Sequence, residues 1–96
     1  IVKAFSESEV NEKIDSIDTS WELIDHTKLK RTIQTDTYAE AARLLDAVAA
    51  IADTEKHHPN LTLSFNCLTI TLTTHNAGGL SRNDFIMAHI IDGMLG

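Results

Sequence analysis

Histidine is the residue of this sequence with the most capacity for chemistry near neutral pH, and five of its 96 residues are histidines. His57 and His58 are adjacent and stand directly before Pro59. Asp53 precedes His57 by four residues, so the two side chains share a face if the segment is helical. A carboxylate in that position can hold an imidazole in one tautomer and stabilise its protonated form. The pattern is therefore typical of a histidine that acts as a general acid or base.

A second group of polar residues follows the last alternating run of the sequence. In a regular strand, Thr73 and His75 lie on the face opposite the apolar residues of that run, and glycines at 78–79 follow. Such a strand end forms a pocket wall if it faces a cavity, and an ordinary solvated surface if it does not. Asp84 stands three residues after Ser81, where it fits a helix capping box as well as a site near the histidines.

These residues also have structural interpretations and a metal interpretation. Basic side chains commonly bind the terminal carbonyl groups of helices, and this is the more frequent role of an isolated His-His pair. The histidines at 57, 58 and 75 and Asp84 are candidate zinc ligands by type, but adjacent residues rarely direct both rings to one ion. Cys-x-x-Cys and His-x-x-x-His pairs are absent, and so is a G-x-S-x-G nucleophile elbow. We therefore expect neither a metal site nor a hydrolase triad.

The first third of the sequence predicts a helix followed by a hairpin. Ser6 and Glu9 form a capping box before apolar residues at helical spacing, which predicts a helix over about residues 7–16. Apolar and polar residues then alternate over 21–25 and 29–34, as in two strands of a hairpin.

The remaining sequence predicts a second hairpin between two further helices. N-cap candidates at 35–37 begin the longest helix, which should end near His57 because Pro59 disfavours helical geometry in the residue before it. The alternation changes phase near Asn66, so we expect two strands, over about 61–65 and 67–74, with a turn or bulge between them.

Ser81 is the expected N-cap of a last helix, and the complete order is helix, two strands, helix, two strands, helix. This order predicts one α+β domain over residues 1–96, a two-layer sandwich in which three helices cover one face of a four-stranded antiparallel sheet.

Composition and charge exclude several classes of function. The formal net charge of −6 and the pI near 5.1 argue against direct binding of nucleic acid. No stretch approaches the roughly 20 apolar residues that span a bilayer, and no signal-peptide core is visible. The single cysteine, Cys67, cannot form an intrachain disulfide, which favours a reducing compartment. We therefore expect a cytoplasmic protein without membrane contact.

Taken together, the site residues resemble the pterin-4a-carbinolamine dehydratase family. The family pattern is an acidic residue, three residues, His-His-Pro, five residues and an aromatic, then a His and, after a glycine-containing loop, an Asp. This sequence matches it with Asp53, His57-His58-Pro59, Phe65, His75 and Asp84. The segment 73–81 is similar to the family's second signature, and the resemblance covers about residues 6–95. Phe65 stands where Tyr or Trp is usual, while Lys56 and Asn76 replace residues that are often acidic or polar.

The resemblance implies a lyase that removes water from a 4a-hydroxytetrahydropterin, giving the quinonoid dihydropterin, in tetrahydropterin recycling without a cofactor. It implies that His57 and His75 are the acid–base pair and that His58 mainly orients the substrate. Asp53 and Asp84 would set the charges of the histidines or bind ring nitrogens. The further substrate contacts that we expect are Lys56, Thr73, Thr74 and Asn76.

Two other functions compete with the enzyme. Family members also resemble dimerisation modules that bind other proteins, so a hydroxylase or a regulatory protein is an alternative partner. The sequence also fits a plain structural domain with surface histidines. Retention of all three motif histidines favours the enzyme. An open sheet edge and the resemblance favour a homodimer or homotetramer.

Overall fold

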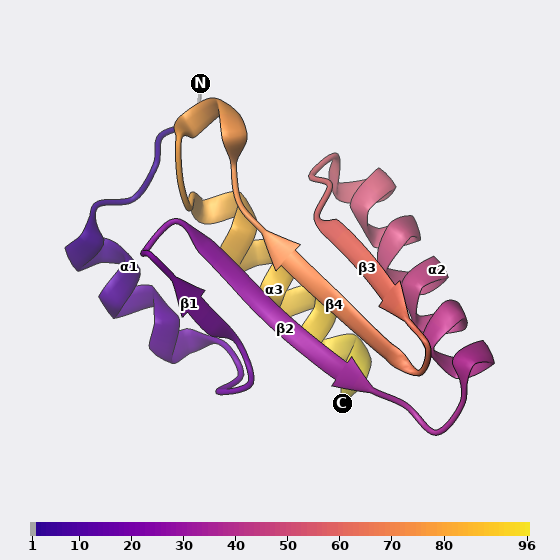
Figure 1. The fold of residues 1–96 in the computed structure, drawn as a ribbon. Helices are drawn as coiled ribbons and strands as arrows, with labels where there is room; N and C mark the ends of the chain where they lie inside the picture. Colours follow the sequence, from indigo (N-terminus) through magenta and orange to yellow (C-terminus); the bar gives the residue numbers. More distant parts are fainter. Residues whose placement is uncertain (1) are drawn as a thin grey trace.

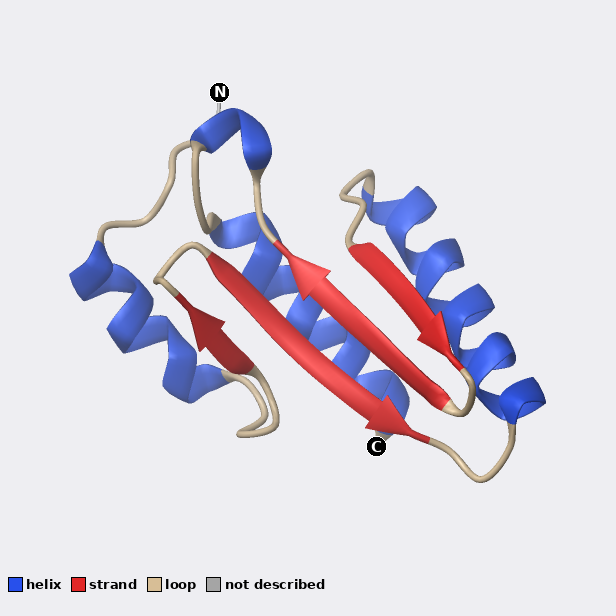
Figure 2. Cartoon of the chain, in the orientation of Figure 1, coloured by secondary structure: helices blue, strands red, loops and turns tan. Residues whose placement is uncertain are grey.

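The fold is built on an antiparallel sheet of four strands in the order β1-β2-β4-β3 (Figure 1). A computed structural model describes residues 2–96, and three helices cover one face of the sheet, as the sequence predicts (Figure 2). The strands are β1 Glu22–Ile24, β2 Lys28–Gln34, β3 Asn60–Ser64 and β4 Cys67–Leu72. The helices are α1 Glu7–Lys13, α2 Tyr38–Glu55 and α3 Arg82–Leu95, with short 3-10 helices η1 Ile14–Ser16 and η2 His75–Ala77.

The register of the sheet determines which side chains form the core. Leu29 of β2 lies opposite Leu72 of β4, and Ile33 lies opposite Leu68, so these four side chains point to one face. Because the helices cover only that face, the opposite face carries mainly threonines and charged residues. The helices contribute to the same core the buried residues Val10, Val48, Ala52, Phe85, Met87, Ala88 and Ile91.

The N-terminal ends of the helices follow the predicted capping chemistry. Ser6 and Glu9 form a complete capping box at α1, and the helical turns continue through η1 to Ser16, in agreement with the predicted range. Thr37 caps α2, and its hydroxyl accepts a hydrogen bond from the backbone of Glu40. Within residues 2–96, no helix is both long and apolar enough to cross a bilayer.

The phase change between β3 and β4 is a tight hairpin turn. Ser64 pairs with Cys67, and the two residues between them form the turn, with a φ of 53° at Phe65. The two predicted strands are confirmed, but β4 ends at Leu72 and not at residue 74. His75 therefore begins η2 and does not end a strand. The prediction that Thr73 and His75 share one face of a regular strand is wrong for this reason.

The C-terminal end of α2 redirects the chain toward the start of α3. The helix ends at Glu55, and Lys56 adopts the left-handed conformation with a φ of 55°. The backbone N–H groups of Lys56 and His57 both donate to the carbonyl of Ala52, which satisfies the helix terminus in the manner of a left-handed cap. His57 consequently lies beyond the helix and not in its last turn.

A half-buried carboxylate ties the last turn of α3 to the sheet. Asp92 accepts hydrogen bonds from the Trp21 indole at 2.7 Å and from the Arg31 guanidinium at 2.6 Å, and from the backbone of Asp18 at 2.9 Å. The arginine and carboxylate side chains are only 14% and 17% exposed, so water screens this pair weakly. The cluster fixes α3 against β2 and the segment before β1.

Candidate active site

Asp84, in the first turn of α3, is a fully buried carboxylate whose two oxygens have different partners. Oδ2 accepts hydrogen bonds from the backbone N–H of Ser81 at 2.9 Å and from the Thr74 hydroxyl at 2.8 Å. Oδ1 lies 2.5 Å from Nε2 of His57. The capping role and the histidine contact, which are alternatives in the sequence, therefore coexist on one side chain.

The burial of Asp84 determines how His57 presents its ring. An ionised carboxylate in the interior requires hydrogen-bond donors, so Nε2 of His57 must carry a proton toward Oδ1 whenever Asp84 is charged. The other ring nitrogen, Nδ1, makes no hydrogen bond within residues 2–96. Nδ1 is therefore the atom that can accept or donate a proton, and the contact with Asp84 orients it, as in carboxylate–histidine pairs of hydrolases.

A hollow of about 380 Å³ opens beside His57. Its volume falls within the range of roughly 300–1,000 Å³ that is usual for small-molecule sites. The side chains that line it come from the N-terminal segment, the end of α2, the η2 turn and the start of α3: Val2, Lys56, His57, Thr74, Asn76 and Asn83. The hollow therefore combines one oriented imidazole with several polar side chains around it.

Asp53 and His58 form a pair of their own outside this hollow. The expected partner of Asp53 is His57, but the structure places Oδ1 of Asp53 3.0 Å from Nε2 of His58. The reason is that α2 ends at Glu55, so the four-residue spacing no longer puts His57 on the helix face of Asp53. The side chains of His58 and Asp53 are 66% and 82% exposed, respectively, and ion pairs so exposed contribute at most about 1 kcal/mol.

His75 and Thr73 also lie outside the set of residues that lines the hollow. His75 is exposed at the start of η2, between Thr74 and Asn76, which both line the hollow. The Thr73 hydroxyl donates to the carbonyl of Thr27 at 2.7 Å and so ties the end of β4 to the β1–β2 hairpin. The structure thus brings together His57, Asp84 and Thr74, whereas His75 is exposed and does not line the hollow.

Two lining residues were not predicted from the sequence. Val2 reaches the hollow because Phe5 donates its backbone N–H to the carbonyl of Leu80 at 2.7 Å, which holds the N-terminal segment beside α3. Asn83 lies in the first turn of α3, next to Asp84. Its position beside a predicted site residue was the only signal in the sequence. Within residues 2–96, no three or more His, Cys, Asp or Glu side chains gather as a metal site would require.

The fold and site define a class of protein: an α+β domain with an open antiparallel sheet and a carboxylate-oriented histidine in a hollow at one end of its helical layer. A sequence profile described as pterin 4 alpha carbinolamine dehydratase matches residues 3–94, and the chain belongs to that family. The predicted resemblance is therefore confirmed.

Relatives and solved structures agree with this assignment. Proteins with provisional names as pterin-4-alpha-carbinolamine dehydratases occur in Trichodesmium erythraeum, 41% identical over 90% of both chains, and in Chloroflexus aggregans, 35% identical over 95% of this chain and 96% of the relative. A transcriptional coactivator/pterin dehydratase from Brucella melitensis superposes with a TM-score of 0.88 at 26% identity, covering 98% of this chain and all of the other. A pterin dehydratase-like RuBisCO assembly factor of the alpha-carboxysome gives 0.66 at 25% identity, covering 80% of this chain and 90% of its own.

Proposed function

We propose that the protein dehydrates a 4a-hydroxytetrahydropterin to the quinonoid dihydropterin by histidine acid–base catalysis, in tetrahydropterin recycling. The observation that carries the proposal is the contact of 2.5 Å between His57 and the buried Asp84 at the edge of a hollow of ligand size. Family membership supplies the reaction class. The proposal includes action in the cytoplasm as a homodimer or homotetramer.

The reaction requires two proton transfers that suit the geometry of His57. The C4a–O bond breaks as the departing hydroxyl gains a proton, and a ring N–H loses a proton, so that water leaves and no redox change occurs. Nδ1 of His57 performs one of these transfers, while Asp84 holds the opposite nitrogen protonated. Positioned acid–base catalysis of this kind contributes roughly 10²–10⁴-fold to the rate.

The other predicted site residues have supporting roles in this proposal. His75, which stands between the lining residues Thr74 and Asn76 in the chain, exchanges the second proton, and His58 with Asp53 orients the part of the substrate that extends out of the hollow. Lys56, Thr74 and Asn76 contact the substrate within the hollow. Thr73 acts indirectly, because its hydroxyl is engaged with the β1–β2 hairpin. No metal or cofactor takes part in the proposed steps.

Stopped-flow dehydration of chemically prepared 4a-hydroxytetrahydropterin tests the proposal. The purified protein is expected to accelerate the reaction, and His57→Ala should lower kcat by about 10²-fold or more. His26→Ala is the matched control, because His26 is an exposed histidine outside the hollow. If the wild-type protein leaves the uncatalysed rate unchanged, the proposal is wrong.

A protein-binding role is the second candidate, and the titles of two structural neighbours favour it. One neighbour is described as a transcriptional coactivator and the other as a RuBisCO assembly factor. Such a role would use surfaces away from Asp84, so a variant with a defective His57 would still bind its partner. Dehydratase activity that disappears with His57 while partner binding persists would establish the two roles as separate.

A further inference from the structure

A hollow between the end of α1 and one face of α3 is separate from the hollow beside His57. Its volume is about 320 Å³, and we call it the α1–α3 hollow. Its apolar lining consists of Phe5, Phe85 and Ile86, and its basic lining consists of Lys13, Arg82 and His89. None of these residues lines the hollow beside His57. A ligand bound in the α1–α3 hollow would therefore contact none of the side chains around the candidate active site.

The apolar part of the α1–α3 hollow is held in place by packing. The ring of Phe5 lies 5.9 Å from the ring of Phe85, and the backbone N–H of Phe5 donates to the carbonyl of Leu80 at 2.7 Å. Phe85 is buried, whereas the side chain of Ile86 is 38% exposed. The hollow therefore presents a fixed apolar surface, part of which the rest of the chain leaves uncovered.

Basic side chains surround this apolar surface. Nζ of Lys13 lies 5.9 Å from the centre of the Phe5 ring. Arg82, Ile86 and His89 have the spacing i, i+4 and i+7 in α3, so they share one face of that helix. Within residues 2–96, no carboxylate belongs to the lining. The hollow thus gathers three of the basic side chains of a chain whose formal net charge is −6.

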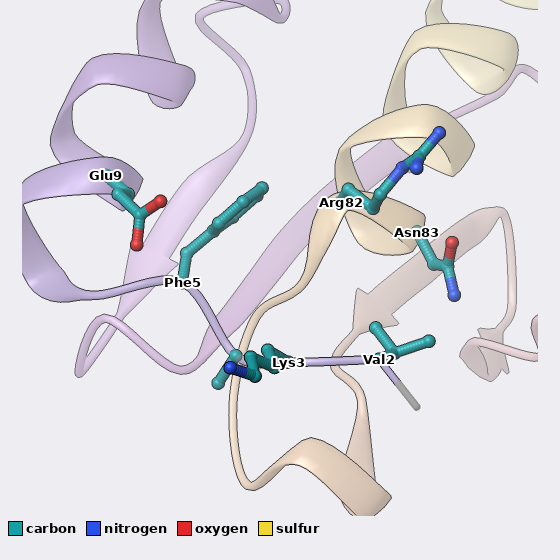
Figure 3. Close-up of a pocket in the computed structure, with 7 residues that line it drawn as sticks. Val2, Lys3, Phe5, Glu9, Arg82 and Asn83 are labelled. Carbon is teal, nitrogen blue, oxygen red and sulfur yellow. The ribbon is translucent and has the colours of Figure 1, made fainter.

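The basic side chains of the α1–α3 hollow have no carboxylate partner of their own. Within the described residues 2–96, none of the three is part of an ion pair. Glu9, one turn before Lys13 in α1, uses its carboxylate to cap that helix. Figure 3 shows Arg82 extending away from Val2, whereas Asn83 lies on the side of Val2. The guanidinium is therefore available to a ligand in the α1–α3 hollow.

The spacing of these donors indicates the kind of ligand. Lysine and arginine only donate hydrogen bonds, so the ligand must supply acceptors. Arg82 and His89 are seven residues apart, about 10.5 Å along the helix axis, which is too far for both to bind one phosphate group. The net charge of −6 disfavours a polyanion such as nucleic acid. A peptide segment with separated carboxylates and an apolar side chain between them matches the spacing and the apolar surface together.

We propose that the α1–α3 hollow is a docking site for an acidic segment of a partner protein. An aromatic or aliphatic side chain of that segment packs on Phe5 and Ile86, and its carboxylates pair with Lys13, Arg82 and His89. This assigns a surface and a chemistry to the protein-binding role, and it does not depend on the dehydration reaction. Because the basic side chains lie at the surface, salt should weaken the binding.

Fluorescence anisotropy with a synthetic peptide tests the proposal. The labelled probe carries a phenylalanine and a leucine one helical turn apart between glutamates. Two matched peptides have lysines in place of the glutamates, or serines in place of the two apolar residues. The wild-type protein is expected to bind only the first peptide. Arg82→Glu should weaken this binding by about tenfold or more, because it places like charges opposite each other. Ile86→Ala should weaken it by about fivefold or more, as for an apolar anchor.

Control variants separate binding from folding and from catalysis. Arg82→Glu should fold, because a negative charge in the first turn of α3 stabilises the helix. Arg43→Glu makes the same charge change at an exposed residue of α2 and should keep the wild-type affinity. Met94, 37% exposed in α3 outside the hollow, provides the control Met94→Ala for Ile86→Ala. Ile86→Ala should also dehydrate the pterin at the wild-type rate, because Ile86 does not line the hollow beside His57.

An NMR titration of the backbone amides locates the bound peptide. Shift changes centred on Lys13, Ile86 and His89 support the docking site. The proposal is wrong if the wild-type protein does not bind the acidic peptide, binds the lysine peptide equally well, or shows shift changes on another face. It is also wrong if Ile86→Ala dissociates a wild-type oligomer, because a second copy of the chain then occupies the hollow. A wild-type protein that binds the peptide and does not dehydrate the pterin would refute the proposed function and leave the docking site standing.

Discussion

Replacement of Asp84 by asparagine isolates the electrostatic role of this carboxylate. The carboxamide has nearly the same shape, and its oxygen can still accept from Ser81 and Thr74 on the capping side. On the other side, its NH2 group would meet Nε2 of His57, which then has to become an acceptor. The proton moves to Nδ1, so the ring nitrogen that Asp84 leaves unbonded can no longer act as a base.

The magnitude follows from the burial of the pair. Asp84 is fully buried and the His57 side chain is 14% exposed, so the lost contact is a charge-assisted bond with little solvent screening. Such bonds contribute about 1.5–3 kcal/mol to stability. Turnover should fall by about 10²-fold or more, the usual contribution of a positioned acid or base, with a smaller change in KM.

The assay combines stopped-flow dehydration with nitrogen NMR of the His57 ring. In the wild-type protein the ring should carry a proton on Nε2, and in Asp84→Asn on Nδ1. Asp46→Asn is the control, since Asp46 is an exposed aspartate of α2. Asp53→Asn should lower turnover less than Asp84→Asn, because its pair with His58 is exposed. A folded Asp84→Asn protein with kcat within about twofold of wild type would refute the reasoning.

Three further predictions concern stability. Asp92→Ala leaves the half-buried Arg31 without its partner and should lower the free energy of unfolding, measured by urea titration, by about 3 kcal/mol. A loss of at most about 1 kcal/mol, as for an exposed ion pair, would contradict this prediction. Hydrogen bonds with Ser6 lower the pKa of Glu9 below 4.5, so the Glu9 carboxylate stabilises the fold above pH 4.5 and loses this effect as the pH falls and it becomes protonated. In Glu9→Gln, the free energy of unfolding should therefore fall less steeply with decreasing pH below 4.5. Lys56→Gly places a glycine, which adopts the left-handed conformation without strain, at this position. The free energy of unfolding should rise by about 1 kcal/mol, which is a Tm higher by about 4–8 °C. A lower Tm would show that the lysine side chain stabilises this turn.

The helices, strands and fold class were predictable because their signals are local. The capping box at Ser6 and Glu9 satisfies helix N–H groups within one turn, so sequence spacing alone is sufficient to identify it. Apolar residues occupy odd positions before Phe65 and even positions after it. One continuous strand cannot direct both groups to the same face of the sheet, so the chain must turn between them. Both features were confirmed.

The pairing of the candidate site residues depends on the backbone after α2 and on contacts between segments, and it was predicted less well. Asp53 and His57 have the spacing of partners on a helix, and that spacing fails because Lys56 takes a left-handed conformation. Thr37 is the N-cap of α2 and Lys56 is its C-cap. Only threonine is a residue type that is typical of its cap position. A lysine at position 56 does not by itself predict the left-handed conformation that turns the chain away from the helix axis.

The sequence by itself determined the elements, the fold class and the family, because periodicity, capping and motif spacing are properties of neighbouring residues. Only the tertiary structure decided that His57 contacts Asp84, that Asp53 contacts His58, and that Val2 and Asn83 line the hollow beside His57. The His57–Asp84 contact joins segments far apart in the chain, whereas the Asp53–His58 contact joins residues five apart and depends on how α2 ends. Their geometry depends on where α2 ends and how α3 packs, which no local pattern encodes.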